Sequence, residues 1–331
     1  MKNKLNSIVL CICLIIIALV FILFCSYNNK KLEDKIKEEN NSSSRIIAVS
    51  INNHHSAWPH SGLQDAFLCY ELIAEGGITR ILAFYKDANT SKIGSVRSVR
   101  HYFLDYVLEN DAIIVHYGFS PQAKEDINTL KINNINGIYD NKTFYRDKTL
   151  NRNLEHTAFT SMDRIKSGIK RNKYRNTSEA KLLNYSDKIY INNKYKSSAK
   201  NVIIKYSNYQ TTSYIYDEKA KAYKLYMNDI EQTDLVTGKT YTVKNIITYQ
   251  IKNVSLNDSK GRQNLENIGE GYGYYISEGN AVKIKWIKKS RESKTNYFNI
   301  DGTPLIVNNG NTWIHIQPKN NLLKIYWNIY I

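Results

Sequence analysis

Side chains that could do chemistry lie at the ends of short apolar runs in the first third of the sequence. Asn53 and His54 follow one such run, and His116 and Ser120 follow another. Mixed α/β domains often place their ligand sites at strand ends and helix starts. A histidine near a serine hydroxyl also suggests nucleophilic catalysis. No Gly-x-Ser-x-Gly motif surrounds Ser120, however, and Ser120-Pro121 equally fits the start of a helix.

Arginines form the second candidate set. Arg97 and Arg100 lie three residues apart, and Arg80 follows the turn signal Glu75-Gly-Gly77. The apolar spacing predicts a helix over Ser95–Asn110, with Arg97 and Arg100 on neighbouring positions near its start. Free backbone N–H groups and two guanidinium groups there would suit a phosphate or carboxylate. The alternative is that an acid within the protein binds these arginines, the candidates being Glu71, Glu75 and Asp105.

The sequence offers no pattern for a metal or a cofactor. The histidines in this region are His54, His55, His60 and His116. No His-Glu-x-x-His and no pair of cysteine ligands accompanies them, so we predict no metal site and no cofactor. Cys69 lies in an apolar run and is predicted to be a buried, unreactive thiol.

The charge of the chain is strongly positive. Its 331 residues include 46 Lys and Arg against 30 Asp and Glu, a net charge of +16. The basic residues are spread along the chain, mostly as lysine, and no nucleic-acid-binding motif accompanies them. We therefore expect a solvated basic surface, with anionic cell-envelope polymers or lipid head groups as partners rather than nucleic acid.

The N-terminus predicts attachment to a membrane. Ile8–Cys25 is an uninterrupted apolar run of 18 residues, and a helix of that length spans about 27 Å. It is either an uncleaved anchor or a secretory signal, and its length favours the anchor. Cys25 is also a weak candidate for lipidation, because Ile22-Leu-Phe24 precedes it; Phe24 stands where a small residue is usual.

The remaining chain is divided by composition. Residues 1–26 are predicted to be the membrane segment, and the polar residues 27–44 a flexible tether. Because no domain precedes the apolar run, we expect everything after it to be extracytoplasmic. The positions of Lys and Arg on both flanks do not decide the orientation by themselves.

Strand and helix signals alternate in residues 45–185, which predicts a mixed α/β domain. Strands are expected at Arg45–Ile51, Ala66–Ala74, Ile78–Tyr85 and Ala112–His116, and helices after Ser120 and over Ser161–Tyr174. A polar stretch, residues 186–199, is the predicted linker. Residues 200–331 alternate apolar and polar positions and predict a β-rich domain. We expect residues 45–185 and 200–331 to form separate packing units. The notable side chains of the β-rich domain are Trp286, Arg291, Tyr297 and Trp313. We expect the aromatic ones mainly as core, the alternative being exposed rings that stack on sugars or peptides.

Several motifs in combination resemble a known family. In the first half they are Ile51-Asn-Asn-His54, Ser61-Gly-Leu63, Glu75-Gly-Gly-Ile-Thr-Arg80, Ile93-Gly-Ser-Val-Arg-Ser-Val-Arg100 and Asp111-Ala-Ile-Ile-Val-His-Tyr-Gly-Phe-Ser-Pro-Gln-Ala123. In the second half they are Gly271-Tyr-Gly-Tyr-Tyr-Ile-Ser277, Ile284-Lys-Trp-Ile-Lys-Lys-Ser-Arg291 and Gly310-Asn-Thr-Trp-Ile314. They cover nearly all of the chain from residue 45 onward.

The family that these motifs resemble is the two-domain YerB-like lipoprotein family of unknown function, DUF3048. The resemblance implies a membrane-anchored extracytoplasmic protein of Gram-positive bacteria and brings no assigned activity. The sequence departs from the family at Phe24 and at His55, where the family usually has proline.

The sequence therefore predicts a membrane-anchored extracytoplasmic binding or accessory protein of the cell envelope that recognises an anionic ligand. The alternative is a cell-envelope hydrolase that uses His116, His54 and the nearby arginines. The candidate ligand-binding residues are Asn53, His54, Arg80, Arg97, Arg100, His116 and Ser120. No catalytic residue can be assigned.

Overall fold

The apolar runs of the first half form strands in the computed structural model, which describes residues 12–17, 20, 42–181, 183–186, 188–191 and 195–326. Residues 12–17 and 20 are helical. Most of the run Ile8–Cys25, Cys25 itself and residues 27–41 of the predicted tether lie outside the described residues.

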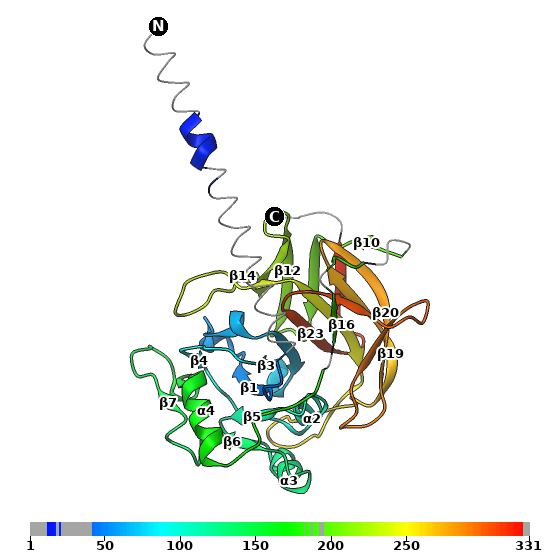
Figure 1. The fold of residues 1–331 in the computed structure, drawn as a ribbon. Coiled ribbons are helices and arrows are strands. Elements are labelled where there is room, and N and C mark those ends of the chain that lie inside the picture. Colours follow the sequence, from blue (N-terminus) through cyan, green and yellow to red (C-terminus); the bar gives the residue numbers. More distant parts are fainter. Residues whose placement is uncertain are drawn as a thin grey trace.

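A large sheet runs through both halves of the described chain (Figure 1). In sheet order its strands are β10 (Ser197–Ser198), β20 (Asn280–Lys288), β19 (Gly269–Ser277), β16 (Asn245–Ile251), β23 (Thr312–Pro318), β2 (Leu68–Ile73), β3 (Thr79–Tyr85), β1 (Ile47–Asn52), β5 (Ile113–His116) and β6 (Asn134–Asn136), with β21 (Asn296–Asn299) beside β20. β1, β2 and β3 are buried along their whole lengths, which explains why they read as continuous apolar runs.

The two halves meet in the middle of this sheet. β2 of the first half pairs in parallel with β23 of the second half, and Glu71 lies opposite His315. The buried apolar side chains of both halves form one core cluster. The expectation that the two halves pack as separate units is therefore wrong: the β-rich half supplies the strand that extends the sheet of the α/β half.

A second sheet covers one face of the first. Its strands are β14 (Ile230–Glu231), β13 (Ala222–Met227), β12 (Thr211–Asp217), β11 (Asn201–Lys205) and β24 (Leu323–Tyr326), with β15 (Thr242–Val243) beside β13. Burial alternates residue by residue along β12 and β13, as the period-two pattern predicted. Smaller pairings join β17 (Asn253–Ser255) to β18 (Gln263–Leu265), β22 (Ile306–Asn308) to β9 (Asn184–Ser186), and β8 (Ala158–Thr160) to both β4 (Ile93–Gly94) and β7 (Tyr145–Arg146).

Two of the three predicted helices are confirmed. α3 (Pro121–Thr129) begins after Ser120, whose hydroxyl accepts a hydrogen bond from the backbone N–H of Ala123. α4 (Met162–Arg171) begins after Ser161, which caps it in the same way. Short 3-10 turns also occur, namely η1 (His55–Ala57), η2 (Leu63–Asp65), η3 (Glu75–Gly77), η4 (His101–Phe103) and η5 (Leu154–His156).

The prediction of a helix over Ser95–Asn110 places the start of that helix too early. The structure has η4 followed by α2 (Leu104–Glu109), whereas residues 95–100 are extended. The backbone N–H of Arg97 donates to Ser50 O, and Tyr117 N–H donates to Arg97 O. Because these backbone groups bond to β1 and to the segment after β5, they are not available for helical hydrogen bonds.

A polar cluster is buried where the two sheets meet, and we call it the buried junction. It consists of Asn53, Glu71, Thr79, Tyr206, Thr212, Tyr214 and His315. The Thr79 hydroxyl donates to Glu71 at 2.7 Å, and the Tyr214 hydroxyl and His315 Nε2 are 2.7 Å apart. Burial raises the pKa of Glu71 to about 7 and lowers the pKa of His315 to about 3. The Thr212 hydroxyl of the second half donates to Glu71 of the first half at 2.9 Å, so hydrogen bonds in this cluster join the two halves.

The aromatic residues that were expected in the core of the β-rich half are buried there. Trp286, Tyr297 and Trp313 are all buried. Arg291 joins the halves, because its Nε lies 2.6 Å from Asp105 Oδ1 and its guanidinium also binds Asp126. Cys69 is fully buried, and burial raises the pKa of its thiol. The predicted linker contains β10, which pairs with β20; the domain boundary at 186–199 stays a prediction.

Candidate functional site: an arginine-lined cleft

The predicted arginines converge on one cleft, which we call the arginine cleft. It has a volume of about 410 Å³. Its lining residues are Asn52, His54, Ala74, Glu75, Ile78, Arg80, Arg97, Arg100, Glu155, His156, Lys260 and Arg262. They come from the end of β1 and the residues after it, the β2–β3 turn and the start of β3, the extended segment before η4, η5 and the β17–β18 turn. Both halves of the chain therefore contribute to this cleft.

Its inner wall is a carboxylate shared by two arginines. Arg100 donates to Glu75 through Nε and through Nη2, the latter at 2.8 Å. Arg80 Nη2 lies 3.3 Å from Glu75 Oε2, and its Nη1 donates to Ser98 O at 2.6 Å. Burial opposes ionisation of Glu75, but the hydrogen bond from Arg100 and the two positive charges hold its pKa below the usual range. Burial and the nearby Arg100 lower the pKa of Arg80 to about 9.

The turn between β2 and β3 positions this shared carboxylate. Gly76 and Gly77 follow Glu75 and have φ values of +67° and +74°, where side chains are disfavoured. A Cβ on Gly77 would also meet Ser207 Oγ at 2.7 Å. The glycines thus let the turn bring Glu75 towards the arginines while it packs against the second half.

The outer rim carries more exposed charges. Arg97 Nη2 lies 2.5 Å from Glu155 Oε2, and the two side chains are 31% and 49% exposed. Arg262 pairs with Asp258 at 2.8 Å within the β17–β18 turn. Lys260 is exposed beside them. Both ion pairs are partly open to solvent, and pairs of this kind contribute little free energy, so their arginines can change partners at low cost.

One end of the cleft holds two histidines. The rings of His54 and His156 are stacked, with centroids 4.8 Å apart. Burial is the main cause that lowers the pKa of both, and the charge of a neighbouring imidazole, His55 for His54 and His54 for His156, lowers each pKa further. His156 Nδ1 lies 2.8 Å from the side-chain amide of Asn52. Near neutral pH the histidines therefore add hydrogen-bonding groups to the cleft and little positive charge.

The seven candidate residues divide into two groups. His54, Arg80, Arg97 and Arg100 line the cleft. The remaining three do not line it and have structural partners. Asn53 donates to Thr79 Oγ1 at 2.7 Å and accepts from Trp58 Nε1; His116 is buried and lies 2.7 Å from Gly118 O; Ser120 caps α3.

Four further lining residues were not among the candidates predicted from the sequence, namely Glu155, His156, Lys260 and Arg262. Glu155 and His156 lie in the short turn η5, and Lys260 and Arg262 lie in a hairpin more than 150 residues from Arg100. A local sequence signal existed only for the turn, in Asp258-Ser-Lys-Gly261. Nothing in that turn indicated that it would close over the arginines of the first half.

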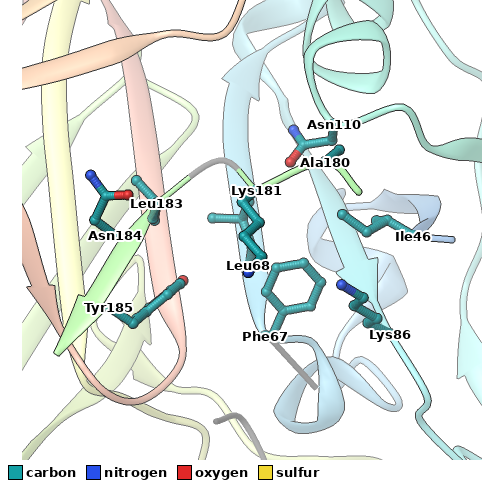
Figure 2. A pocket seen from close by; sticks show the side chains of 10 residues that line it. All are labelled: Ile46, Phe67, Leu68, Lys86, Asn110, Ala180, Lys181, Leu183, Asn184 and Tyr185. Atoms are coloured by element: carbon teal, nitrogen blue, oxygen red, sulfur yellow. The ribbon is translucent and has the colours of Figure 1, made fainter. Parts of the chain in front are cut away.

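A smaller hollow lies where the segment after α4 passes the start of β2 (Figure 2). Its volume is about 250 Å³, with Ile46 and Lys86 on one side and Asn184 and Tyr185 on the other (Figure 2). None of the predicted site residues lines it. Within the described residues, no group of three or more His, Cys, Asp or Glu side chains is arranged to hold a metal ion.

Comparisons with known proteins cover nearly the whole chain. Residues 34–175 match the N-terminal domain, and residues 192–314 the C-terminal domain, of a protein of unknown function, DUF3048. The chain is 31% identical over 301 residues to a Bacillus subtilis (strain 168) protein named "Putative lipoprotein YerB", covering 89% of this chain and 86% of that one.

A solved structure agrees with this match. The crystal structure of the YerB protein from Bacillus subtilis aligns with a TM-score of 0.76 and 30% identity, over 86% of this chain and 94% of that chain. No helix among the described residues has the length and hydrophobicity needed to cross a membrane. The two matched domains, the curated relative and its structure together show that the chain belongs to the DUF3048 family.

Proposed function

We propose that this protein is a membrane-tethered, extracytoplasmic accessory protein that binds an anionic ligand of the cell envelope in the arginine cleft. The apolar run Ile8–Cys25 supports the tether, as does the name of the Bacillus subtilis relative, a lipoprotein. The cleft supports the ligand class. The family brings no assigned activity, so the chemistry of the cleft is the guide to the ligand.

One observation carries the proposal: the cleft gathers basic side chains from distant segments in excess of its acids. Five basic residues and two carboxylates line it. Bringing like charges together costs free energy unless something compensates them. Glu75 compensates Arg80 and Arg100 in the inner wall, whereas Arg97 and Arg262 at the rim pair with acids that are partly open to solvent.

The geometry favours a phosphate or carboxylate group at the rim. A guanidinium group binds such planar or tetrahedral anions through two parallel hydrogen bonds. Glu155 is 49% exposed, so a ligand could replace it on Arg97 without burying a charge that lacks a partner. A volume of about 410 Å³ is within the range of small-ligand sites.

The hydrolase alternative lacks the arrangement that it requires. His116 does not line the cleft, and its ring is held by Gly118 O and the Asn134 side chain. Ser120, the candidate nucleophile, caps α3. His54 lies in the cleft without a serine hydroxyl bound to its ring nitrogens among the described residues.

Calorimetric titration of the full-length protein with inorganic pyrophosphate tests the proposal. Arg97→Lys with Arg262→Lys keeps the charge and removes the paired hydrogen bonds; Arg97→Gln with Arg262→Gln removes both. We expect the lysine variant to bind at least about tenfold more weakly, and the glutamine variant more weakly still.

A matched control is Arg171→Gln. Arg171 also forms an exposed ion pair, with Asp140 at 2.8 Å, but it lies on α4 away from the cleft. Its affinity for pyrophosphate should equal that of the unmodified protein. Equal affinities for all variants, or no binding by the unmodified protein, would refute the cleft as an anion site.

The tether is tested separately. The full-length protein should sediment with membranes, and Cys25→Ser should not release it if the apolar run is an uncleaved anchor. Release by this single change would instead assign membrane attachment to a lipid on Cys25.

A further inference from the structure

A further hollow, distinct from the arginine cleft and from the hollow in Figure 2, lies where the described main body of the chain begins. Its volume is about 580 Å³, and its lining includes Ser44 and Arg45. Ser44 pairs with Thr177, and Arg45 N–H donates to Asn176 O, so the start of the body is held against the segment that follows α4. The hollow is therefore next to the predicted tether.

The floor of this hollow is apolar and one wall is basic. Ile113, Met162 and Ile169 are buried and form part of the floor. Lys166, Lys170 and Lys173 form the wall, and we call them the lysine stripe. Lys166 and Lys170 lie four residues apart on one side of α4, and Lys173 follows two residues after its end.

The stripe is not compensated by acids within the described part of the chain. None of its three lysines forms an ion pair there, and Lys166 donates only a long hydrogen bond, 3.4 Å, to Ala88 O. Asp87 is the one acid in the lining, while the nearby Asp111 is bound by Arg45 and Arg175. All three lysines are exposed, so their ammonium groups can meet an anion from outside the chain.

We infer that the lysine stripe binds the head groups of anionic phospholipids at the membrane surface to which the N-terminus attaches the protein. This inference rests on the membrane attachment in the proposed function, but on different residues from the arginine cleft. The stripe supplies charge complementary to lipid phosphates, and the apolar floor offers a place for the first carbons of the lipid.

The position of the stripe favours lipid over a soluble polymer. Residues 26–41 separate Cys25 from Ser42, so the two are joined by at most about 60 Å of chain. The stripe adjoins the end of that chain, so it is the basic surface held at high local concentration near the bilayer. Each lysine at an anionic surface is expected to change the equilibrium of contact about fivefold.

The test measures how fast an amine-reactive ester acetylates individual lysines. Full-length protein is incorporated into vesicles of phosphatidylcholine alone or with phosphatidylglycerol, and modified lysines are quantified by mass spectrometry. Lys219, Lys239 and Lys289 are exposed, belong to the second half, and serve as internal controls. We expect phosphatidylglycerol to slow acetylation of the stripe several-fold and to leave the control lysines unchanged, with the difference lost at high salt.

Other results would overturn the inference. Equal acetylation of the stripe in both kinds of vesicle refutes lipid contact. Protection by an added soluble polyphosphate, without protection by phosphatidylglycerol, would assign the stripe to a polymer. Failure of the protein to remain with the vesicles contradicts the proposed tether instead, so the two failures are distinguishable.

The variant Lys166→Gln, Lys170→Gln, Lys173→Gln gives a second readout. In phosphatidylglycerol vesicles, deuterium uptake of residues 162–176 should rise in this variant to the level seen in phosphatidylcholine. The triple change Lys219→Gln, Lys239→Gln, Lys289→Gln removes the same charge and should leave that uptake unchanged. If both variants behave alike, overall charge and not the stripe determines the contact.

Discussion

The arginine cleft and the buried junction both combine carboxylates with basic or imidazole groups, yet their surroundings differ. In the junction, Glu71 and His315 are fully buried, and their hydrogen bonds are all made within the protein. In the cleft, Arg97 and Glu155 are partly exposed and lie 2.5 Å apart at the rim. The comparison teaches that polar groups at the meeting of the two halves serve the fold where they are buried, and remain available to a ligand where they are exposed.

Because the buried contacts between the halves serve the fold, we first predict that the two halves stay together when the chain is cleaved between residues 186 and 199. β2 and β23 are neighbours in one sheet, and the core is shared. The cut protein should elute as one species from a gel-filtration column under native conditions and as two fragments in denaturant. Two fragments that elute separately and remain folded would show that the halves are independent after all.

Among single substitutions, one that breaks a buried ion pair between the halves should have the largest effect on stability. Lys288 Nζ lies 2.7 Å from Glu109 Oε2, with both side chains at most 1% exposed. Lys288→Met leaves the Glu109 charge buried without its partner, which should lower the free energy of unfolding by about 3–5 kcal/mol. The exposed neighbour provides the control: Lys289→Met should change it by less than about 0.5 kcal/mol in denaturant titrations.

Glu71 should make stability depend on pH. Its folded pKa of about 7 is above its ordinary value of 4.5, so the folded state retains a proton that the unfolded chain releases. This contribution to stability is fully present below pH 4.5 and is lost as the pH rises to about 7. The buried His315 has a lowered pKa, so its contribution to stability is instead lost as the pH falls below about 6.5.

The substitution Glu71→Gln isolates the first effect. The amide side chain cannot ionise, so the stability of the variant relative to the unmodified protein should increase between about pH 4.5 and 7, by up to roughly 3 kcal/mol. Urea titrations across this range measure the difference. A difference that stays constant with pH would show that Glu71 is already ionised in the folded protein.

Within the cleft, the inner and rim arginines should differ in their effect on stability. Arg100 is only 12% exposed and binds Glu75, so Arg100→Ala should cost about 1–3 kcal/mol. Arg97→Ala breaks an exposed pair and should cost less than about 1 kcal/mol. Thermal unfolding of the two variants checks this order, and equal losses would mean that Arg97 also serves the fold.

The sequence predicted the elements better than their connections. Buried strands such as β1 and β5 were recognisable from their apolar runs, and the caps Ser120 and Ser161 marked two helices correctly. The start of α2 was misplaced because Arg97 makes its backbone hydrogen bond to β1. Such a long-range pairing outweighs the local helical spacing and leaves no periodic trace in the sequence.

The site was predicted only in part for a similar reason. Arginines near strand ends indicated the cleft, but Asn53 and His116 carry the same local signal and are buried structural groups. Arg262 was missed because it reaches the cleft only through the packing of the second half against the first. Residue type and spacing therefore identified the candidates, whereas burial shows which of them serve the fold and which are accessible to a ligand.

The most direct test that the rim of the arginine cleft binds a ligand while the buried groups serve the fold is the change in thermal unfolding midpoint that inorganic pyrophosphate causes. A ligand at a hundredfold excess over its Kd should raise the midpoint of the unmodified protein by roughly 5 °C. Arg97→Gln with Arg262→Gln should keep the unliganded midpoint and lose this increase, whereas Lys288→Met should lower the unliganded midpoint and keep the increase. A full pyrophosphate-induced increase in the Arg97, Arg262 variant would contradict the assignment of the cleft as the anion site.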